Sequence, residues 1–295
     1  MYDVAIIGGG PAGLTAALQL GRARRKVLLL DAGEPRNAKA IEVHGFLTRD
    51  GTPPREMRRL AHVELERYRT VERRIEWVQR LEPAADRVTL HVGCDTVDAR
   101  RVLLATGMVD EPPDLPGFRE LWGESIFQCP YCHGYEVADQ PWGYWARLET
   151  MVGAGFPQLL RAWTDDVIVF TGGAYAVPND VRATLARAEI RLDERRLLGF
   201  RAETGKLAAV QLEGGEVARS VLFAHPPQRQ TALVSEAGIA LDEWGFVKVD
   251  MHMQTSVPRI HAAGDLTTMR QSAQIAAGNG NLAAASINHL LMNAI

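Results

Sequence analysis

The sequence has only three cysteines in 295 residues, too few for a disulfide framework. It also lacks any apolar run approaching the roughly 18 residues that span a bilayer. The chain passes from Met1 directly into a strand-like apolar run, which leaves no room for a signal peptide. The net charge of −3 gives no reason to expect nucleic acid or an acidic membrane as partner. We therefore expect a protein of the reducing cytoplasm that binds neither membranes nor nucleic acid.

The composition is that of an ordinary globular protein, with 46% hydrophobic and 23% charged residues. A chain of 295 residues is long for one hydrophobic core. Its length therefore favours two domains.

Two of the three cysteines form a C-x-x-C motif in the stretch Cys129-Pro-Tyr-Cys-His-Gly134. In a turn that opens a helix, this spacing brings the sulfurs of Cys129 and Cys132 within bonding reach, and the helix N-terminus lowers the pKa of the first thiol. The pair could be a redox centre, half of a zinc site or a structural link. The third cysteine, Cys94, lies in a segment that alternates like a strand, so we expect a buried thiol without a role there.

The first 31 residues have the pattern of a dinucleotide-binding unit. An apolar strand over residues 2–7 leads into a glycine-rich turn, a helical pattern and a second strand over 27–30 that ends at Asp31. Glycines at the G-x-G-x-x-G positions permit a tight turn, close approach of a pyrophosphate and close packing of helix on strand, while Asp31 can accept hydrogen bonds from a ribose. The turn residues expected at the cofactor are Gly8, Gly10, Pro11, Ala12 and Gly13.

Two further motifs resemble those of flavoproteins that have two dinucleotide-binding domains. The run 253–265 ends in Ala-Ala-Gly264-Asp265, which resembles the second FAD motif, and an expected helix over 271–292 follows it. The turn Ala105-Thr106-Gly107 resembles the exit from such an FAD domain. The resemblance implies that Asp265 holds the cofactor, and that the helix opened by Arg270, Gln271 and Ser272 stabilises negative charge on the reduced flavin.

Taken in order, GGGPAG, ATG, C-x-x-C and TSVPRIHAAGD resemble the low-molecular-weight thioredoxin reductase family over nearly the whole chain. This resemblance implies an α/β fold with two Rossmann-like domains, each with three layers (ββα). It also implies FAD, a homodimer, and a C-x-x-C that meets the flavin ring. We expect an FAD-binding domain formed by residues 1–113 and 225–295, and an inserted domain over 114–224.

The inserted domain departs from that family at its second nucleotide site. A glycine loop is expected at about residues 148–153, but the sequence there is Leu-Glu-Thr-Met-Val-Gly. A basic pair for the NADPH 2′-phosphate is expected after the strand 167–170, and Thr-Gly-Gly-Ala follows that strand instead. We therefore expect FAD without NADPH, and no metal.

A second departure is His133, where thioredoxin reductases carry an aspartate directly after the second cysteine. An imidazole, with an ordinary pKa near 6.5, can accept and return a thiol proton near neutral pH. We expect His133 to transfer protons beside the redox pair.

A C-x-x-C beside a lost NADPH site resembles the dithiol oxidases that close disulfides in natural products such as gliotoxin, holomycin and romidepsin. The resemblance implies that a small-molecule dithiol reduces a Cys129–Cys132 disulfide by exchange and that Cys129 forms the mixed disulfide. Cys132 would then pass electrons to the flavin, and dioxygen would take them as hydrogen peroxide. The biological setting would be natural product biosynthesis or self-resistance.

A few side chains are candidates for the walls of a substrate pocket. Tyr131 and Tyr135 lie close to the second cysteine in sequence. A possible cofactor turn, Glu34-Pro35-Arg36-Asn37, ends at Asn37, and the loop that follows it contains His44. For Trp142 and Trp145 we favour an ordinary place in the core. Asn37 and His44 are expected on the flavin or substrate side.

Two other functions are compatible with the same motifs. A disulfide reductase could receive electrons from a donor such as ferredoxin, since it would need the same C-x-x-C and no NADPH site. A catalytically silent flavoprotein could act as a scaffold or sensor, although it would have no need of the cysteine pair or of His133.

Overall fold

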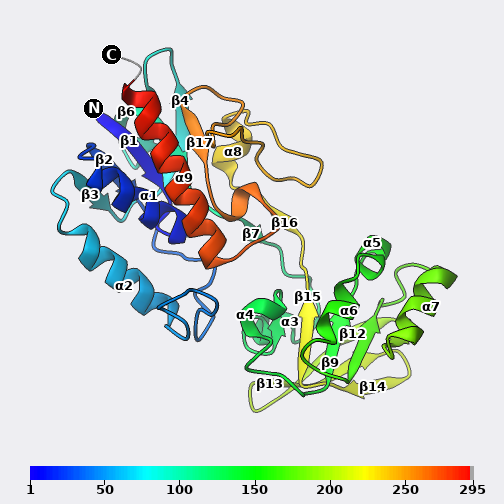
Figure 1. Cartoon of the computed structure of the whole chain (residues 1–295). Coiled ribbons are helices and arrows are strands. Elements are labelled where there is room, and N and C mark those ends of the chain that lie inside the picture. The colour runs from blue at the N-terminus through cyan, green and yellow to red at the C-terminus, as the bar shows by residue number, and fades with distance from the viewer. Residues whose placement is uncertain (293–295) are drawn as a thin grey trace. The chain divides into compact units, whose positions relative to one another are not determined.

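The computed structural model describes residues 1–292 and divides the chain into two compact units. Unit 1 combines Met1–Val109 with the chain from Gln228 onward, and unit 2 is the inserted stretch Asp110–Pro227. In Figure 1 the blue N-terminal and red C-terminal segments accordingly share one unit. These boundaries lie a few residues from the expected positions 113 and 224.

Unit 1 is built on a seven-stranded mixed sheet. Strands β1, β2, β3 and β17 and the second half of β6 run parallel, whereas β4, β5 and the first half of β6 form an antiparallel meander. Across the sheet the strands are β3 (Val71–Arg74), β2 (Val27–Leu30), β1 (Tyr2–Ile7), β6 (Asp95–Leu104), β5 (Val88–Val92) and β4 (Val78–Pro83), with β17 (Ile260–Ala262) also paired to β6.

Alternation along β1 shows how the three layers of this unit form. Val4 and Ile6 point to the side covered by α1 (Pro11–Arg22) and α9 (Ala273–Met292), while Ala5 and Ile7 pack with residues of the meander. All four residues are buried, because the central strand is covered on both faces. The helix predicted over 271–292 is α9, which begins two residues later.

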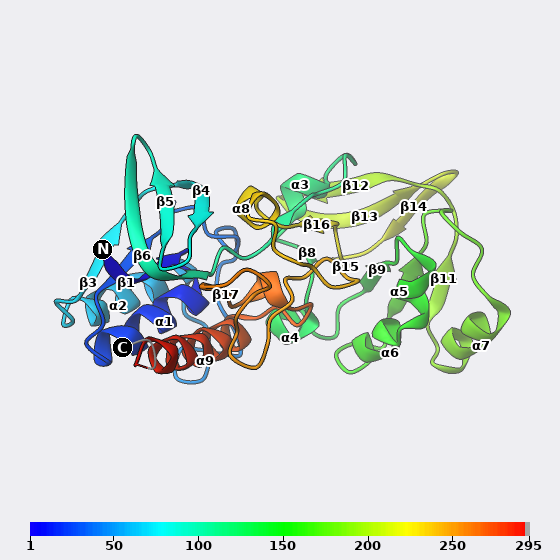
Figure 2. The same ribbon diagram turned by 90° about the horizontal axis from the view of Figure 1, so that it is seen from above.

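The helices α1 and α9 lie side by side on one face of the sheet (Figure 2). A Cβ atom on Gly280 of α9 would lie 2.1 Å from the carbonyl oxygen of Ala12 in α1. Only glycine allows this approach, which holds the N-terminal end of α1 against the middle of α9.

Unit 2 repeats the same three layers. Its five-stranded parallel sheet is covered on one side by the three-stranded antiparallel sheet β12–β13–β14, and on the other by short helices. The order is β11 (Arg191–Asp193), β10 (Val167–Phe170), β9 (Trp142–Trp145), β15 (Val221–Ala224) and β8 (Ile126–Phe127). Trp142 and Trp145 are buried in this core, as expected. The predicted fold class, two Rossmann-like domains of three layers each, is confirmed.

The remaining elements complete the two units. Those of unit 2 are α3 (Phe118–Leu121), α4 (Pro130–His133), α5 (Glu149–Gly153), α6 (Phe156–Leu160), α7 (Asn179–Arg187), β12 (Leu197–Glu203), β13 (Lys206–Leu212) and β14 (Gly215–Ala218). Those of unit 1 are α2 (Pro54–Leu65), α8 (Ala232–Glu236) and the 3-10 helix η1 (Asp265–Thr267). The strands β7 (Val109–Asp110) and β16 (Gln228–Arg229) pair where the chain passes from one unit to the other.

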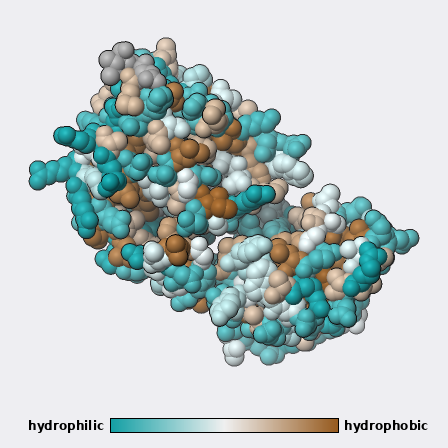
Figure 3. Space-filling view, viewed as in Figure 1, coloured by the Kyte–Doolittle hydropathy of each residue, from teal (hydrophilic) through white to brown (hydrophobic). Residues whose placement is uncertain are grey.

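Among residues 1–292, no helix has the length and apolarity needed to cross a membrane. On the face shown in Figure 3, hydrophilic residues interrupt the apolar ones on both units.

A fully buried histidine lies in β17. The Nδ1 of His261 is 3.3 Å from the carbonyl oxygen of His252, and its Nε2 is 3.2 Å from a guanidinium nitrogen of Arg101. Burial, reinforced by the positive charge of Arg101, lowers the pKa of His261 to about 4. The ring is therefore neutral in the folded protein at pH 7, where it accepts the hydrogen bond of Arg101.

This histidine should make unit 1 sensitive to acid. Between pH 6.5 and 4 the unfolded chain protonates His261 while the folded chain does not, so stability falls as the pH falls, by about 3 kcal/mol in total. The substitution His261→Gln keeps a donor and an acceptor but cannot titrate, so it should remove this part of the pH dependence. Urea unfolding of the wild type and the variant at pH 7 and pH 4.5 measures the difference. Equal losses of stability in both proteins would contradict the assignment.

Candidate cofactor and dithiol sites

The turn after β1 requires glycine at two of the three predicted positions. Gly8 has φ +110°, and a Cβ atom on it would lie 2.3 Å from the carbonyl oxygen of Ala105. A Cβ on Gly13 would lie 1.9 Å from the carbonyl oxygen of Gly8. Both glycines are thus fixed by the close packing of α1 against the ends of β1 and β6.

Gly10 differs from its neighbours because the fold itself does not require it. Its backbone is extended (φ −78°, ψ −177°), and apart from Gly10 itself and its two chain neighbours no described residue has an atom within 4 Å of where its Cβ would be. Pro11 begins α1, and the backbone N–H groups of Ala12 and Gly13 belong to the first turn of this helix. Open space before the N-terminus of a 12-residue helix fits the pyrophosphate of a dinucleotide.

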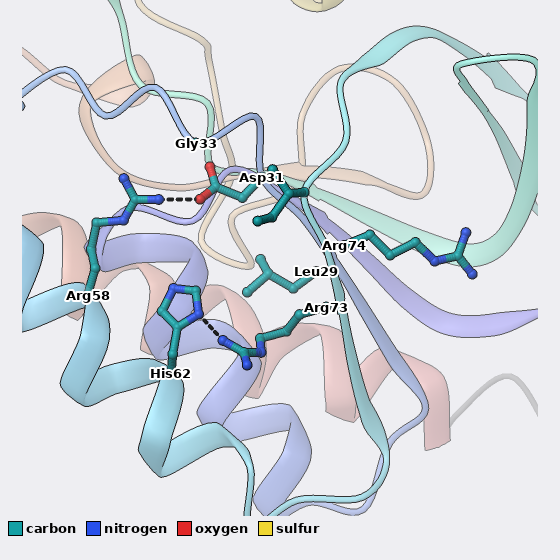
Figure 4. A pocket seen from close by; sticks show the side chains of 8 residues that line it. Leu29, Asp31, Gly33, Arg58, His62, Arg73 and Arg74 are labelled. Carbon is teal, nitrogen blue, oxygen red and sulfur yellow. Dashed lines mark hydrogen bonds and ion pairs between the residues drawn. The ribbon is translucent and has the colours of Figure 1, made fainter.

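Asp31, at the end of β2, lies against the same turn. A Cβ on Gly9, a position that the motif leaves open, would be 2.4 Å from its carboxylate, so a larger residue there would force the Asp31 side chain to move. The carboxylate also forms an ion pair with Arg58 of α2 (Figure 4). Both oxygens of a carboxylate accept hydrogen bonds, so Asp31 can bind Arg58 and a ribose hydroxyl together.

A pocket of about 260 Å³ opens beside Asp31 at the carboxyl ends of β2 and β3. It is where the adenosine end of a dinucleotide fits, if the pyrophosphate lies at the start of α1. In Figure 4, His62 of α2 points to Arg73 of β3 within it. The pocket is lined by Leu29, Asp31, Gly33, Arg58, His62, Arg73, Arg74 and Ile75.

A polar network surrounds Asp265, which begins η1. The guanidinium of Arg36 lies 3.1 Å from the Asp265 carboxylate and donates a hydrogen bond of 2.7 Å to the side chain of Gln271. Gln271 in turn exchanges hydrogen bonds with Gln228. Arg36, from the loop after β2, is thus a candidate cofactor residue; it belongs to the possible cofactor turn but was not among the predicted site residues. Its neighbour Asn37, which we had predicted, is exposed.

The other predicted cofactor residues follow β6 or lie between β17 and α9. Ala105 donates its N–H to Ile7, and the hydroxyl of Thr106 lies 3.5 Å from that of Thr231. Gly107 and Gly264 both have positive φ, +64° and +96°. Ser272 accepts the N–H of Ile275 and so caps α9, whereas Arg270 before it is exposed.

Four loops of unit 1 therefore meet where a doubly wound sheet binds its dinucleotide. They follow β1, β2, β6 and β17, and they bring a helix N-terminus, an open turn and two carboxylates to one edge. These groups fit FAD: the N-terminus of α1 at Gly10 would hold the pyrophosphate, and the carboxylates of Asp31 and Asp265 would accept hydrogen bonds from hydroxyl groups of the cofactor.

The dithiol of unit 2 lies in a single helical turn. Cys129 immediately precedes α4, the two sulfurs are 2.7 Å apart, and both residues are half-buried. The hydrogen bond from the Cys132 thiol lowers the pKa of Cys129 to about 7, with the backbone N–H groups of Cys132 and Tyr131 adding to it and burial opposing it. Such a thiol is about half ionised at pH 7, far more than an ordinary cysteine, which suits thiol–disulfide exchange better than a structural role.

The side chains next to the cysteines have contrasting environments. The ring of His133 is stacked on Phe127 with centroids 4.4 Å apart, and both of its nitrogens are buried. Tyr131 and Tyr135 are 70% and 85% exposed, so both are accessible to a substrate. His44, the third predicted substrate residue, belongs to unit 1, where it lies between the carboxylates of Glu42 and Asp50.

Two hydrogen bonds tie together the strand ends of unit 2 at the edge where a second dinucleotide would bind. The loop after β9 contains no glycine, and α5 follows it at once. The hydroxyl of Tyr175, after β10, donates 2.8 Å to the carbonyl of Ala146, after β9. The Nε of Arg147 donates 3.3 Å to the carbonyl of His225, after β15.

Aromatic side chains fill the space behind these hydrogen bonds. The His225 ring lies edge-on to Tyr144 and Phe156, with centroids 5.9 and 4.8 Å away. Burial, with the charge of Arg147, lowers the pKa of His225 to about 4, so the ring is neutral. Burial also raises the pKa of Tyr175 to about 12, which keeps its hydroxyl a donor.

Two further expectations concern cysteine and metal. The prediction that Cys94 is buried is wrong: it is exposed in the turn that joins β5 to β6, because the strand alternation ends at Gly93. In the described part of the chain, no group of three His, Cys, Asp or Glu side chains could hold a metal ion. Cys129 and Cys132 therefore have no third or fourth zinc ligand beside them among the described residues.

The chain matches one protein family and is similar to several known proteins over nearly its whole length. The family described as pyridine nucleotide-disulphide oxidoreductase matches residues 2–162 and 166–280. Thioredoxin reductase tcpT of Claviceps purpurea is 31% identical over 306 residues, which cover 96% of this chain and 92% of that protein. Thioredoxin reductase sirT of Leptosphaeria maculans is 30% identical over 313 residues, covering 100% and 95%. The crystal structure of HlmI superposes with a TM-score of 0.92 at 37% identity, covering 99% of this chain and 93% of that one.

Proposed function

Because this chain belongs to the pyridine nucleotide-disulphide oxidoreductase family of FAD-binding flavoproteins, we propose that it oxidises a small-molecule dithiol to an intramolecular disulfide. The exchange runs through Cys129 and Cys132, and the electrons pass by way of FAD to dioxygen, which becomes hydrogen peroxide. NADPH takes no part in the reaction.

The main support for this proposal is that unit 2 keeps its dithiol but not an open nucleotide-binding edge. Its dithiol is intact and its first thiol has a pKa of about 7. At its nucleotide edge the loop after β9 has no glycine, and the hydrogen bonds of Tyr175 and Arg147 cross this edge. A pyrophosphate needs open backbone at such an edge, as Gly10 provides in unit 1. Electrons are therefore expected to enter from thiols and not from a nicotinamide.

The exchange steps follow from the two sulfurs. A substrate thiolate attacks the sulfur of Cys129 in the Cys129–Cys132 disulfide, and the electron pair of the broken bond remains on Cys132. The second substrate thiolate then attacks the substrate sulfur of the mixed disulfide. The cyclic disulfide product leaves, and the electron pair of that bond remains on Cys129.

The environment of Cys129 favours the second of these steps. A thiolate of low pKa is the better leaving group in disulfide exchange, and the Cys132 thiol and two N–H groups stabilise Cys129 as thiolate. His133 follows Cys132 directly and is assigned to accept the protons of the substrate thiols. Tyr131 and Tyr135 offer exposed aromatic surface for the rest of the substrate.

FAD, when bound, would accept the two electrons of the enzyme dithiol and deliver them to dioxygen. The balance is one dithiol and one dioxygen consumed for one disulfide and one hydrogen peroxide formed. The two protons of the peroxide come from the substrate thiols, so no other reductant is required.

The product balance tests this proposal. Purified FAD-loaded protein, given a small dithiol in air, should consume about one dioxygen and form about one hydrogen peroxide for each disulfide. An oxygen electrode, a peroxidase-coupled assay and mass spectrometry of the product measure the three quantities. Disulfide reduction supported by reduced ferredoxin, without peroxide, would instead favour the reductase. Absence of turnover with any dithiol would favour the silent flavoprotein.

A further inference from the structure

One aromatic side chain of unit 2 contacts the dithiol turn at two points. The ring of Tyr131, between the two cysteines, meets the ring of Trp163 edge-on with centroids 5.4 Å apart. A Cβ atom on Gly134, at the end of the same turn, would lie 3.1 Å from the indole nitrogen of Trp163. Trp163 follows α6 in sequence, so it comes from a different part of the unit than the turn it contacts.

Trp163 packs against Trp142 on the side of the core and is hydrogen-bonded through its backbone. Its ring is stacked on that of Trp142, with centroids 6.3 Å apart and planes 25° apart. Trp142 is fully buried, and its indole N–H donates 2.8 Å to the carbonyl of Val137. The carbonyl of Trp163 accepts the N–H of Asp139 at 2.9 Å. These contacts connect the dithiol turn to the core of unit 2.

The turn needs such support because it is too short to be stable alone. The helix α4 has four residues, and an isolated helix of that length does not persist in water. Stacking of His133 on Phe127 holds one side of the turn, and Trp163 contacts Tyr131 and Gly134. The backbone N–H groups that reach Cys129 belong to Tyr131 and Cys132, the residues that this packing orients.

We propose that Trp163 is a positioning residue for the dithiol: its indole ring holds the turn between Cys129 and Cys132 in the conformation from which Cys129 reacts. This role presupposes the redox function proposed for the two cysteines. This role of Trp163 requires no contact with the substrate or the flavin, because the ring acts through Tyr131 and Gly134.

Alkylation of the reduced protein tests this role without substrate, oxygen or turnover. The rate of iodoacetamide reaction at Cys129, followed by mass spectrometry from pH 5.5 to 9.5, reports the pKa of its thiol. In the wild type the midpoint is expected at about 7. In Trp163→Leu it should rise to about 8 or higher, toward the value of an unassisted thiol. Trp163→Phe retains an aromatic ring beside Tyr131 and should restore most of the wild-type midpoint.

Two other variants separate positioning from general stability. Phe156→Leu removes a ring from the same hydrophobic layer, but the ring contacts of Phe156 are with Tyr144 and His225 and not with Tyr131, so the midpoint should stay at about 7 even if the protein melts earlier. Tyr131→Leu removes the edge contact at an exposed position, where the core is not at risk, and should raise the midpoint as Trp163→Leu does. A midpoint of about 7 in both Trp163→Leu and Tyr131→Leu would overturn the role of Trp163. A normal pH profile in a protein that fails to oxidise dithiols would instead count against the proposed function.

Discussion

A Cys132→Ser variant with bound FAD is expected to keep its yellow colour when a small dithiol is added without oxygen. Serine cannot form the disulfide that the substrate attacks, so the exchange has no starting point. The rate of flavin reduction by dithiol should fall at least about 1000-fold, as expected when one member of a catalytic unit is removed. Stopped-flow absorbance of the flavin measures this rate.

The same substitution at Cys94 provides a matched control. Cys94 is exposed in a turn of unit 1, and nothing in the proposed reaction uses it, so Cys94→Ser should reduce its flavin at the wild-type rate. Dithiol-driven bleaching of Cys132→Ser at the rate of the control would mean that electrons reach the flavin without the C-x-x-C motif. The exchange mechanism would then be wrong.

Gly10→Ala is expected to separate cofactor binding from folding. Alanine fits the extended backbone of Gly10, and its methyl group meets no described residue beyond its two chain neighbours, so the apoprotein should melt close to the wild type. That methyl group would occupy the space assigned to the FAD pyrophosphate. The affinity for FAD should therefore fall about 100-fold or more, equivalent to about 2.7 kcal/mol. Fluorescence titration of the apoprotein with FAD gives the dissociation constant.

Gly13→Ala provides the opposite outcome as a comparison. Its methyl group would lie 1.9 Å from the carbonyl oxygen of Gly8, so the backbone of the turn must shift before any cofactor binds. The apoprotein itself should lose about 3 kcal/mol of stability, the upper range for an overpacked site. Wild-type affinity for FAD in Gly10→Ala would show that the pyrophosphate does not approach the chain at this turn.

The parts of the fold that were predicted correctly depend on neighbours in sequence. The strand, the glycine turn and the helix of residues 2–22 follow one another directly, and both the hydrophobic period and the glycine spacing are local. The long helix α9 was predicted within two residues because its apolar pattern is continuous. Cys94 was misplaced because a pattern of alternation does not show where a strand turns back.

The parts that were missed depend on contacts between distant residues. Arg36 and Asp265 are 229 positions apart in sequence, and Arg58 of α2 pairs with Asp31 at the end of β2. Arg36 lies in a possible cofactor turn, but nothing in the sequence indicates its partners, and nothing near Arg58 distinguishes it from the many solvated arginines of this chain. Gly9 stands at a position that the motif leaves open, and only the packing of Asp31 against it explains the glycine.

Unit 2 illustrates the same limit. The missing glycine loop was evident from the sequence near residue 148, because the expected turn has a fixed place after a strand. What lies across that edge was not evident, since Tyr175, Arg147 and His225 follow three different strands. The contact of Trp163 with Tyr131 was likewise not evident from the sequence, because it is tertiary.

The direction of electron entry is the central claim, and one anaerobic measurement tests it most directly. The FAD-loaded protein is mixed separately with a small dithiol and with NADPH, and the flavin absorbance is followed in both samples. The dithiol should bleach the flavin within the time of one turnover, and NADPH should leave it oxidised; admission of air to the first sample should restore the colour with formation of hydrogen peroxide. Rapid bleaching by NADPH would contradict this account, because it would require a functional dinucleotide site at the edge that Tyr175 and Arg147 cross.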